Sequence, residues 1–385
     1  MSLYHELSGK WGPRAQLALD TIAMRPRRQV ATYCIFAMDI PLMERLTGNA
    51  PGSYVADPNR IYLAFQNLAG TCFIDQYIPD NPLTMGQEGY EQDTAKTATT
   101  GAEHVVVDDM LIDTPEAVVE HMERVAWPRL RKEIELFDAQ DPATIERFIA
   151  AESAIQARFS PAILKGPYVT ALPVVHYGRY GYENYLMAYA LYPEVMEKDF
   201  AQQAELANKR NQLYAAAIVR GGMPRLLRLD HDLADSRGTL VDVKSLDRLW
   251  FPHFQRSIRP LLDAGIRLIW HCDGNLMEMV PRLIGCGITG FQGFQYEDGM
   301  DYEKICRMKG RNGEDLLIIG GVSVTRTLPM GTPQDVKDQI KWLVDSGPKV
   351  GLFLGPSSSI TPRTNHENIR TLLEGLAYYR EHGRD

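Results

Sequence analysis

The sequence predicts an α/β fold, a single (β/α)8 TIM barrel. Short apolar and β-branched runs alternate with longer helical stretches, which is the pattern of repeated βα units. Eight such short runs can be counted, as a closed barrel requires. A length of 385 residues suits one α/β barrel. We therefore expect residues 1–385 to form one domain.

The eight predicted strands follow one another along the whole chain. They are residues 29–36, 71–78, 160–168, 224–229, 267–271, 288–294, 316–320 and 350–354. Helical patterns occupy residues 114–139, 194–219, 333–345 and 366–380. Two of these begin with Thr-Pro, a pair that supplies an N-cap and then a proline in the first turn.

A long insertion separates the second and third predicted strands. It covers about residues 80–158 and contains a hairpin pattern at 104–112 and at least two helices. No Ser/Gly/Pro-rich linker bounds it. We expect it to cap one end of the barrel, and a separate small domain is the alternative.

Composition narrows the class of protein. Hydrophobic residues make up 45% and charged residues 23%, which is typical of a globular protein with a large core. The formal net charge of −8 argues against nucleic acid or an anionic membrane as the main partner. The five cysteines form no C-x-x-C pair, and neither a secretory signal nor a membrane-spanning run is visible. We expect a cytoplasmic protein.

The tip of the fifth predicted strand carries the first candidate site. Active sites of (β/α)8 barrels lie at the carboxyl ends of the strands. His271 and Asp273 are two residues apart, so both side chains point to one face while Cys272 points away. An imidazole and a carboxylate can bind a divalent metal or act as an acid/base pair. Alternatively, Asp273 caps the next helix and His271 is a core histidine.

The fourth predicted strand ends in a second polar group. Asp230 and Asp232 share a face by the same alternation, and His231 lies on the other. We take Asp232 and His231, with His271 and Asp273, as candidate catalytic residues. The candidate metal ligands are His271, Asp273 and Asp232. Turn capping by these aspartates is the alternative.

Other polar residues follow the remaining predicted strands. The candidate substrate-binding residues are Gln295, Asp80, Tyr77, Ser358 and Arg237. Glu297 is a further possible metal ligand, and Asp75 lies close to the second strand tip. Each of these positions also suits an ordinary turn or a solvated loop. The chain has no Walker A, G-x-S-x-G or H-E-x-x-H motif.

Residues 224–385 resemble the uroporphyrinogen decarboxylase (URO-D) superfamily, especially its methyltransferase branch. The matching stretches include LDHDLADSRGTLV, RLIWHCDGNL, LLIIGGVSV and KVGLFLGPSSSI, and Gly166-Pro167 resembles a glycine-proline after the family's third strand. The resemblance implies a (β/α)8 barrel of the uroporphyrinogen decarboxylase type. It covers the N-terminal half only loosely.

The resemblance implies a corrinoid-dependent methyltransferase of the O-demethylase type. Relatives that act on thiols bind zinc through a His-x-Cys and a later cysteine. The corresponding positions here are His271, Asp273 and the region of Ser358, so both thiolates are missing. A His-x-Asp-Gly pattern resembles instead the branch that demethylates aryl ethers or methylated amines.

Three functions follow as hypotheses. The first is methyl transfer from a methoxyaromatic or methylamine to a separate corrinoid protein, since no D-x-H-x-x-G cobalamin motif occurs in this chain. The second is a decarboxylase-like lyase acting on a tetrapyrrole, which needs arginines that do not follow the first strand. The third is a barrel that binds a ligand without turnover. A divalent metal such as zinc is the candidate bound cofactor, none is covalent, and a homodimer is expected from the superfamily.

Overall fold

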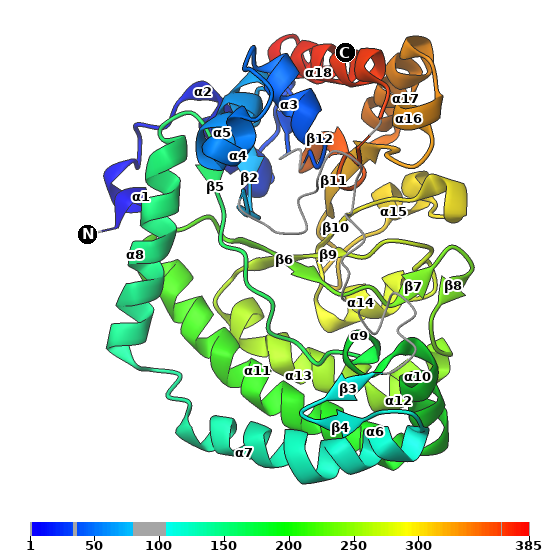
Figure 1. The fold of residues 1–385 in the computed structure, drawn as a ribbon. Helices are drawn as coiled ribbons and strands as arrows, with labels where there is room; N and C mark the ends of the chain where they lie inside the picture. Colours follow the sequence, from blue (N-terminus) through cyan, green and yellow to red (C-terminus); the bar gives the residue numbers. More distant parts are fainter. Residues whose placement is uncertain (1, 34–36, 80–104, 363, 385) are drawn as a thin grey trace.

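The computed structural model describes residues 2–33, 37–79, 105–362 and 364–384. Its centre is a parallel six-stranded sheet in the order β1-β12-β11-β10-β9-β6 (Figure 1). A parallel pair, β2-β5, lies beside β1, because a bridge joins Tyr33 to Phe73. Among the described residues, no ladder joins β5 to β6. The molecule is thus a mixed α/β protein built around parallel strands.

All eight predicted strands are present and parallel, although most are shorter than expected. They are β1 (Ala31–Thr32), β2 (Phe73–Ile74), β5 (Leu164–Lys165), β6 (Leu226–Asp230), β9 (Arg267–His271), β10 (Gly290–Gln292), β11 (Leu317–Val322) and β12 (Leu352–Pro356). Residues 34–36 of the first predicted strand lie outside the described residues. Two small antiparallel hairpins are β3 (Val106–Val107) with β4 (Met110–Leu111), and β7 (Ala234–Asp235) with β8 (Gly238–Thr239).

Helices surround these strands. The longer ones are α2 (Pro13–Ile22), α5 (Pro58–Leu68), α7 (Trp127–Leu136), α8 (Pro142–Phe159), α10 (Tyr182–Leu191), α11 (Pro193–Gly221), α13 (Phe251–Asp263), α17 (Pro333–Ser346) and α18 (His366–Glu381). The shorter ones are α1 (Leu3–Glu6), α3 (Ile40–Leu46), α4 (Ser53–Ala56), α6 (Pro115–His121), α9 (Tyr177–Tyr180), α12 (Val243–Leu249), α14 (Val280–Cys286), α15 (Tyr302–Arg307) and α16 (Thr327–Met330). A π-helical segment, η1 (Met122–Ala126), joins α6 to α7, and η2 (Tyr296–Asp298) is a 3-10 turn.

The predicted helix starts are confirmed by their caps. Thr332 and Asp335 form a reciprocal capping box at α17, which satisfies backbone N–H groups that have no partner inside the helix. Thr114 accepts a hydrogen bond from the Ala117 N–H at α6. The four predicted helical ranges correspond to α6 to α7, α11, α17 and α18.

The described part of the long insertion contains the predicted hairpin, β3 with β4, and the helices α6, α7 and α8. These helices pack against α10 and α11 on the outside of the sheet (Figure 1). Residues 80–104 lie outside the described residues, so the cap over one end of the strands stays a prediction. None of the described helices is both long and apolar enough to cross a membrane.

The strands of the large sheet are buried along nearly their whole length. β11 and β12 are buried at every position, as expected when helices cover one face and packed side chains cover the other. Because these strands are parallel, their carboxyl ends lie at one edge of the sheet and their amino ends at the other. A cavity lies at each of these two edges.

Candidate active site

A cavity of about 360 Å³ lies at the carboxyl ends of the strands. Polar residues at the ends of β6, β9, β10 and β12, and in the segment after β2, make up much of its wall. They are Asp75, Gln76, Arg228, Asp230, Asp232, His271, Asp273, Gln292, Gln295, Ser358 and Ser359. Four of these residues are aspartates and one is an arginine, so acidic groups predominate.

Strand register brings the central polar residues together. Asp230 pairs with His271 across β6 and β9, and His271 pairs with Gln292 across β9 and β10. In a parallel sheet, paired residues project from the same face, so all three side chains enter one cavity. The predicted alternation is confirmed: Asp230 and Asp232 line the cavity, whereas His231 and Cys272 do not.

Three of these side chains are close enough to share a metal ion. Ligand atoms of Asp230, Asp232 and His271 all lie within 4.8 Å of one another. The sequence-based set contained Asp273 in place of Asp230. Asp230 joins the group because it is the register partner of His271, and Asp273 is not part of it. Two carboxylates and an imidazole are a donor set that suits a divalent cation.

One ring nitrogen of His271 makes no hydrogen bond to the described residues. The side chain is nearly buried, and Nδ1 has no hydrogen-bond partner among the described residues. Gly293 passes close by with φ of 81°, and a Cβ there would lie 2.6 Å from Nδ1. The neighbouring strand therefore admits the ring only because residue 293 is glycine. An unpaired buried nitrogen in a polar cavity is a binding position for a ligand or a metal.

Arg228 organises one wall of the cavity. Its Nε donates to Asp75 at 2.8 Å, and its Nη1 donates to Asp230 at 2.8 Å. Burial alone would raise the pKa of Asp75, but Arg228 and the Tyr33 hydroxyl hold it below its usual value. Asp75 is therefore ionised and its charge is matched by Arg228.

Tyr168 packs on the other side of Arg228. The guanidinium carbon lies 4.9 Å from the ring centre, and the hydroxyl is 3.3 Å from Asp230 Oδ2. Burial, with repulsion from Asp230 and Asp75, raises the pKa of Tyr168 to about 12. The hydroxyl thus remains a hydrogen-bond donor at neutral pH.

Asp273 has the opposite electrostatic environment to Asp75. Burial first, and then the nearby carboxylates of Asp232 and Asp230, raise its pKa above the usual value, against attraction from His271. Its Oδ1 is buried without a hydrogen-bond partner among the described residues, and its backbone N–H donates to Asp232 at 3.0 Å. A carboxyl group in such surroundings can retain a proton for acid catalysis.

Two of the predicted substrate-binding residues lie at this cavity. Gln295 and Ser358 both line it, and Gln295 Oε1 accepts a hydrogen bond from the Gly274 N–H at 2.6 Å. Asp80 lies outside the described residues.

Tyr77 and Arg237 do not line the cavity. The ring of Tyr77 packs edge-on against Tyr62 and Phe159, because the chain after β2 turns it into the core. Arg237 is 89% exposed and pairs with Asp235 in the β7–β8 hairpin. Glu297 is also elsewhere, where it accepts hydrogen bonds from Ser323 and Thr325.

His231 is not among the cavity residues either. Its Nε2 accepts a hydrogen bond from the Val175 N–H at 2.9 Å, and its ring stacks on Tyr177. Burial, with the nearby His176, lowers the pKa of His231 to about 4. Its geometry is that of a neutral structural histidine that fixes the loop after β5.

Sequence reasoning missed Arg228 and Gln292. Arg228 lies two residues before Asp230 in an otherwise apolar strand, and Gln292 interrupts an apolar run in the same way. A charged or amide side chain within a buried strand was the signal available for both. For Tyr33 and Tyr168 the sequence carried no such signal.

Comparisons with known proteins were made over the whole chain. No protein-family model matches it. Methylcobamide:CoM methyltransferase MtbA of Methanosarcina acetivorans is 23% identical over 170 residues, which are 44% of this chain and 46% of that protein. The chain therefore matches less than half of that relative's length.

Solved structures give a broader match. A methyltransferase from Methanosarcina mazei aligns with a TM-score of 0.57 at 15% identity, covering 95% of this chain and 98% of that one. At this identity the match shows the fold alone. A B12-independent methionine synthase from a Shewanella species has a TM-score of 0.40 at 15% identity, covering 61% of this chain and 65% of that one. The chain is thus similar to a methylcobamide:CoM methyltransferase over part of its sequence and to a methyltransferase in its fold, in agreement with the resemblance stated from the sequence.

Proposed function

We propose that this protein is a methyltransferase that moves a methyl group from a small methylated substrate to a separate corrinoid protein. The observation that carries the proposal is the convergence of Asp230, Asp232 and His271 in a cavity at the carboxyl ends of the strands. The similarity to methyltransferases supports methyl transfer in general. The substrate class, methoxyaromatics or methylamines, and the corrinoid partner belong to the proposal.

We propose also that the strands form a closed barrel of the uroporphyrinogen decarboxylase type. Ladders or bridges connect every neighbouring pair in the ring except β5 and β6. Across that remaining gap, the Tyr168 hydroxyl lies 3.3 Å from Asp230. Eight parallel strands with helices outside support this closure.

A divalent cation, zinc in the first instance, fits the donors present. Asp230 and Asp232 would supply oxygen and His271 nitrogen, which leaves positions for substrate. When bound, such an ion would stabilise negative charge that develops on a leaving oxygen or nitrogen.

The neighbouring residues have distinct tasks in this proposal. Asp273 would pass a proton to the departing oxygen or nitrogen as the methyl bond breaks, since burial raises its pKa and favours the protonated form. Gln295 and Ser358 offer hydrogen bonds that orient the substrate. The Arg228–Asp75 pair fixes Asp230 in position.

The charge of the cavity weighs against the lyase alternative. A tetrapyrrole with many carboxylates needs several arginines, and Arg228 is already paired with Asp75 and Asp230. A cavity lined by four aspartates suits a neutral or cationic substrate. Cytoplasmic location and a homodimer stay predictions.

Methyl transfer to free cob(I)alamin tests the proposal. The purified protein, supplied with zinc, is mixed with a panel of methoxyaromatics and methylamines, and the cobalt oxidation state is followed by visible absorbance. We expect transfer from at least one substrate, and its loss in His271→Ala. The matched control is His382→Ala, which alters an exposed histidine of the C-terminal segment. No transfer from any panel member would contradict the proposal.

A further inference from the structure

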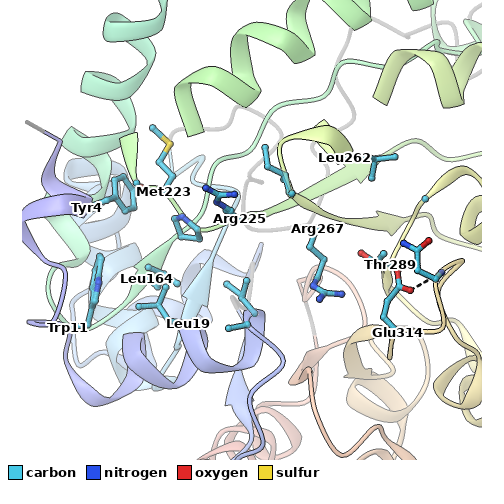
Figure 2. A pocket seen from close by; sticks show the side chains of 18 of the residues that line it. Tyr4, Trp11, Leu19, Leu164, Met223, Arg225, Leu262, Arg267, Thr289 and Glu314 are labelled. Atoms are coloured by element: carbon cyan, nitrogen blue, oxygen red, sulfur yellow. Dashed lines mark hydrogen bonds between the residues drawn. The ribbon is translucent and has the colours of Figure 1, made fainter. Parts of the chain in front are cut away.

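A second and larger cavity, of about 520 Å³, lies at the opposite edge of the sheet. Figure 2 shows Tyr4 and Trp11 at one end of it and Glu314 at the other, with Arg225 and Arg267 between them. The walls come from α1, α2 and the segments that precede β6, β9, β10 and β11. None of the residues proposed for methyl transfer lines this cavity.

Strand β9 connects the two cavities. Arg267 is its first residue and His271 its last. Four residues of strand span roughly 13 Å, so the two sites are separate places on one rigid element. A ligand in the second cavity therefore does not contact the first.

Arg267 supplies an unused hydrogen-bond donor. Its Nη1 is buried and has no hydrogen-bond partner among the described residues. Burial lowers the pKa of Arg267, against the attraction of Glu314. A buried guanidinium nitrogen without an acceptor is unfavourable, so an anion that reaches Nη1 of this half-buried side chain gains a charge-assisted hydrogen bond.

The charged residues around Arg267 make the cavity positive overall. Arg225 and Arg311 also line it, and Glu314 is its acidic residue. Arg225 Nη1 donates to the Ala264 carbonyl, and Glu314 Oε2 accepts from the Asn312 N–H at 2.9 Å. Three arginines and one glutamate leave a local charge of +2 in a chain whose formal charge is −8.

The rest of the wall is apolar and aromatic. Tyr4 and Trp11 stand together with ring centres 6.4 Å apart and Leu19 near them, whereas Leu262 lies toward the other end of the cavity (Figure 2). Apolar walls with a few convergent polar groups are typical of small-molecule sites. Inorganic phosphate has no apolar body to pack against this wall, so it should bind more weakly than an aromatic carboxylate.

We propose that this cavity binds a small organic carboxylate with an apolar or aromatic body. The carboxylate accepts hydrogen bonds from Arg267, with Arg225 and Arg311 nearby, and the body packs against Tyr4 and Trp11. The site is independent of the proposed methyl transfer.

Titration calorimetry with three probes tests the chemistry. We expect phenylacetate to bind the full-length protein with a Kd below about 1 mM. Phenylacetamide has the same shape without the charge and should bind at least about tenfold more weakly, since one charged hydrogen bond contributes that much. Inorganic phosphate should also be weaker. Equal binding of the acid and its amide, tighter binding of phosphate, or no binding by phenylacetate overturns the proposal.

Binding to variants shows whether phenylacetate occupies this cavity. Arg267→Gln and Arg311→Gln should each weaken phenylacetate binding, whereas Arg259→Gln, on the exposed face of α13, should not. Arg267 Nη1 has no partner to lose among the described residues, and circular dichroism checks that both variants fold. His271→Ala should bind phenylacetate as the wild type does. Loss of binding in His271→Ala, or unchanged binding in both arginine variants, contradicts a site at this cavity.

Discussion

Asp230 and His271 are register partners at the ends of adjacent parallel strands, β6 and β9. This pairing puts a carboxylate beside an imidazole that has a free Nδ1. The pair rests on backbone hydrogen bonds of two buried strands, so its geometry does not depend on a loop. Rigid elements of this kind are where binding groups are held most accurately.

The first prediction concerns the metal ligands. Asp230→Asn should weaken zinc binding by about 100-fold, since it removes a charged ligand, and Asp273→Asn should weaken it much less. Competition with a chromophoric chelator measures both affinities. Asp235→Asn, in the neighbouring hairpin, is the matched control because Asp235 pairs with exposed Arg237. A larger loss in Asp273→Asn than in Asp230→Asn would restore the ligand set expected from the sequence.

The second prediction concerns the buried ion pair of Arg228 and Asp75. Their side chains are 6% and 3% exposed, so Arg228→Met leaves a buried carboxylate without its main partner. We expect a loss of about 3–5 kcal/mol in the free energy of unfolding, measured by urea denaturation. The double variant Arg228→Met/Asp75→Leu should recover most of it, because neither charge remains.

Arg237→Met is the control for this second prediction. Arg237 is 89% exposed, so its loss should leave the free energy of unfolding nearly unchanged. If Arg228→Met and Arg237→Met lost equal free energy of unfolding, burial of the Arg228–Asp75 pair would add no stability beyond that of an exposed pair. Failure of the double variant to recover would point to the packing of the side chains instead of their charge.

The strands could be predicted from sequence because each is a short apolar run between helical stretches. Their lengths could not, because a ladder forms only where a neighbouring strand is in reach. The expected strand 160–168 is reduced to Leu164–Lys165 for this reason, with β2 as its one ladder partner among the described residues.

The cavity was predictable in part. Alternation along the strand places Asp230 and Asp232 on one face. Because the next strand is parallel and adjacent, His271 at its end is expected near them, and all three line the cavity. The Arg228–Asp75 pair joins residues 153 positions apart, and nothing local signals it. His231 was assigned to the site by proximity in sequence, although alternation already placed it on the other face.

The third prediction concerns His231 and pH. Its Nε2 accepts a hydrogen bond from the Val175 N–H. A proton on Nε2 would turn this acceptor into a donor and bring two N–H groups face to face. The folded pKa of about 4 lies below the unfolded value of about 6.5, so the unfolded state takes up the proton first. The stabilisation is complete above about pH 6.5 and is lost as the pH falls toward 4.

Urea denaturation at pH 7.5 and pH 5, with chelator present, measures this effect. Between these values the wild type should lose about 2 kcal/mol more than His231→Gln, which cannot titrate. Parallel losses in both proteins would exclude His231 as the titrating group.

The fourth prediction concerns Gly274, which follows Asp273 directly. Its φ is 82°, and an added Cβ would lie 2.6 Å from the Asp235 carbonyl oxygen. Gly313 has φ of 83° with nothing within 4 Å of an added Cβ, so it carries the same backbone preference without the clash. Both alanine variants should lose about 1–2 kcal/mol from the left-handed conformation. Gly274→Ala should lose more in urea denaturation and should also reduce methyl transfer, because the loop that positions Asp273 must move. Equal losses of stability in Gly274→Ala and Gly313→Ala would mean that the β7–β8 hairpin moves aside without cost and does not hold Asp273 in place.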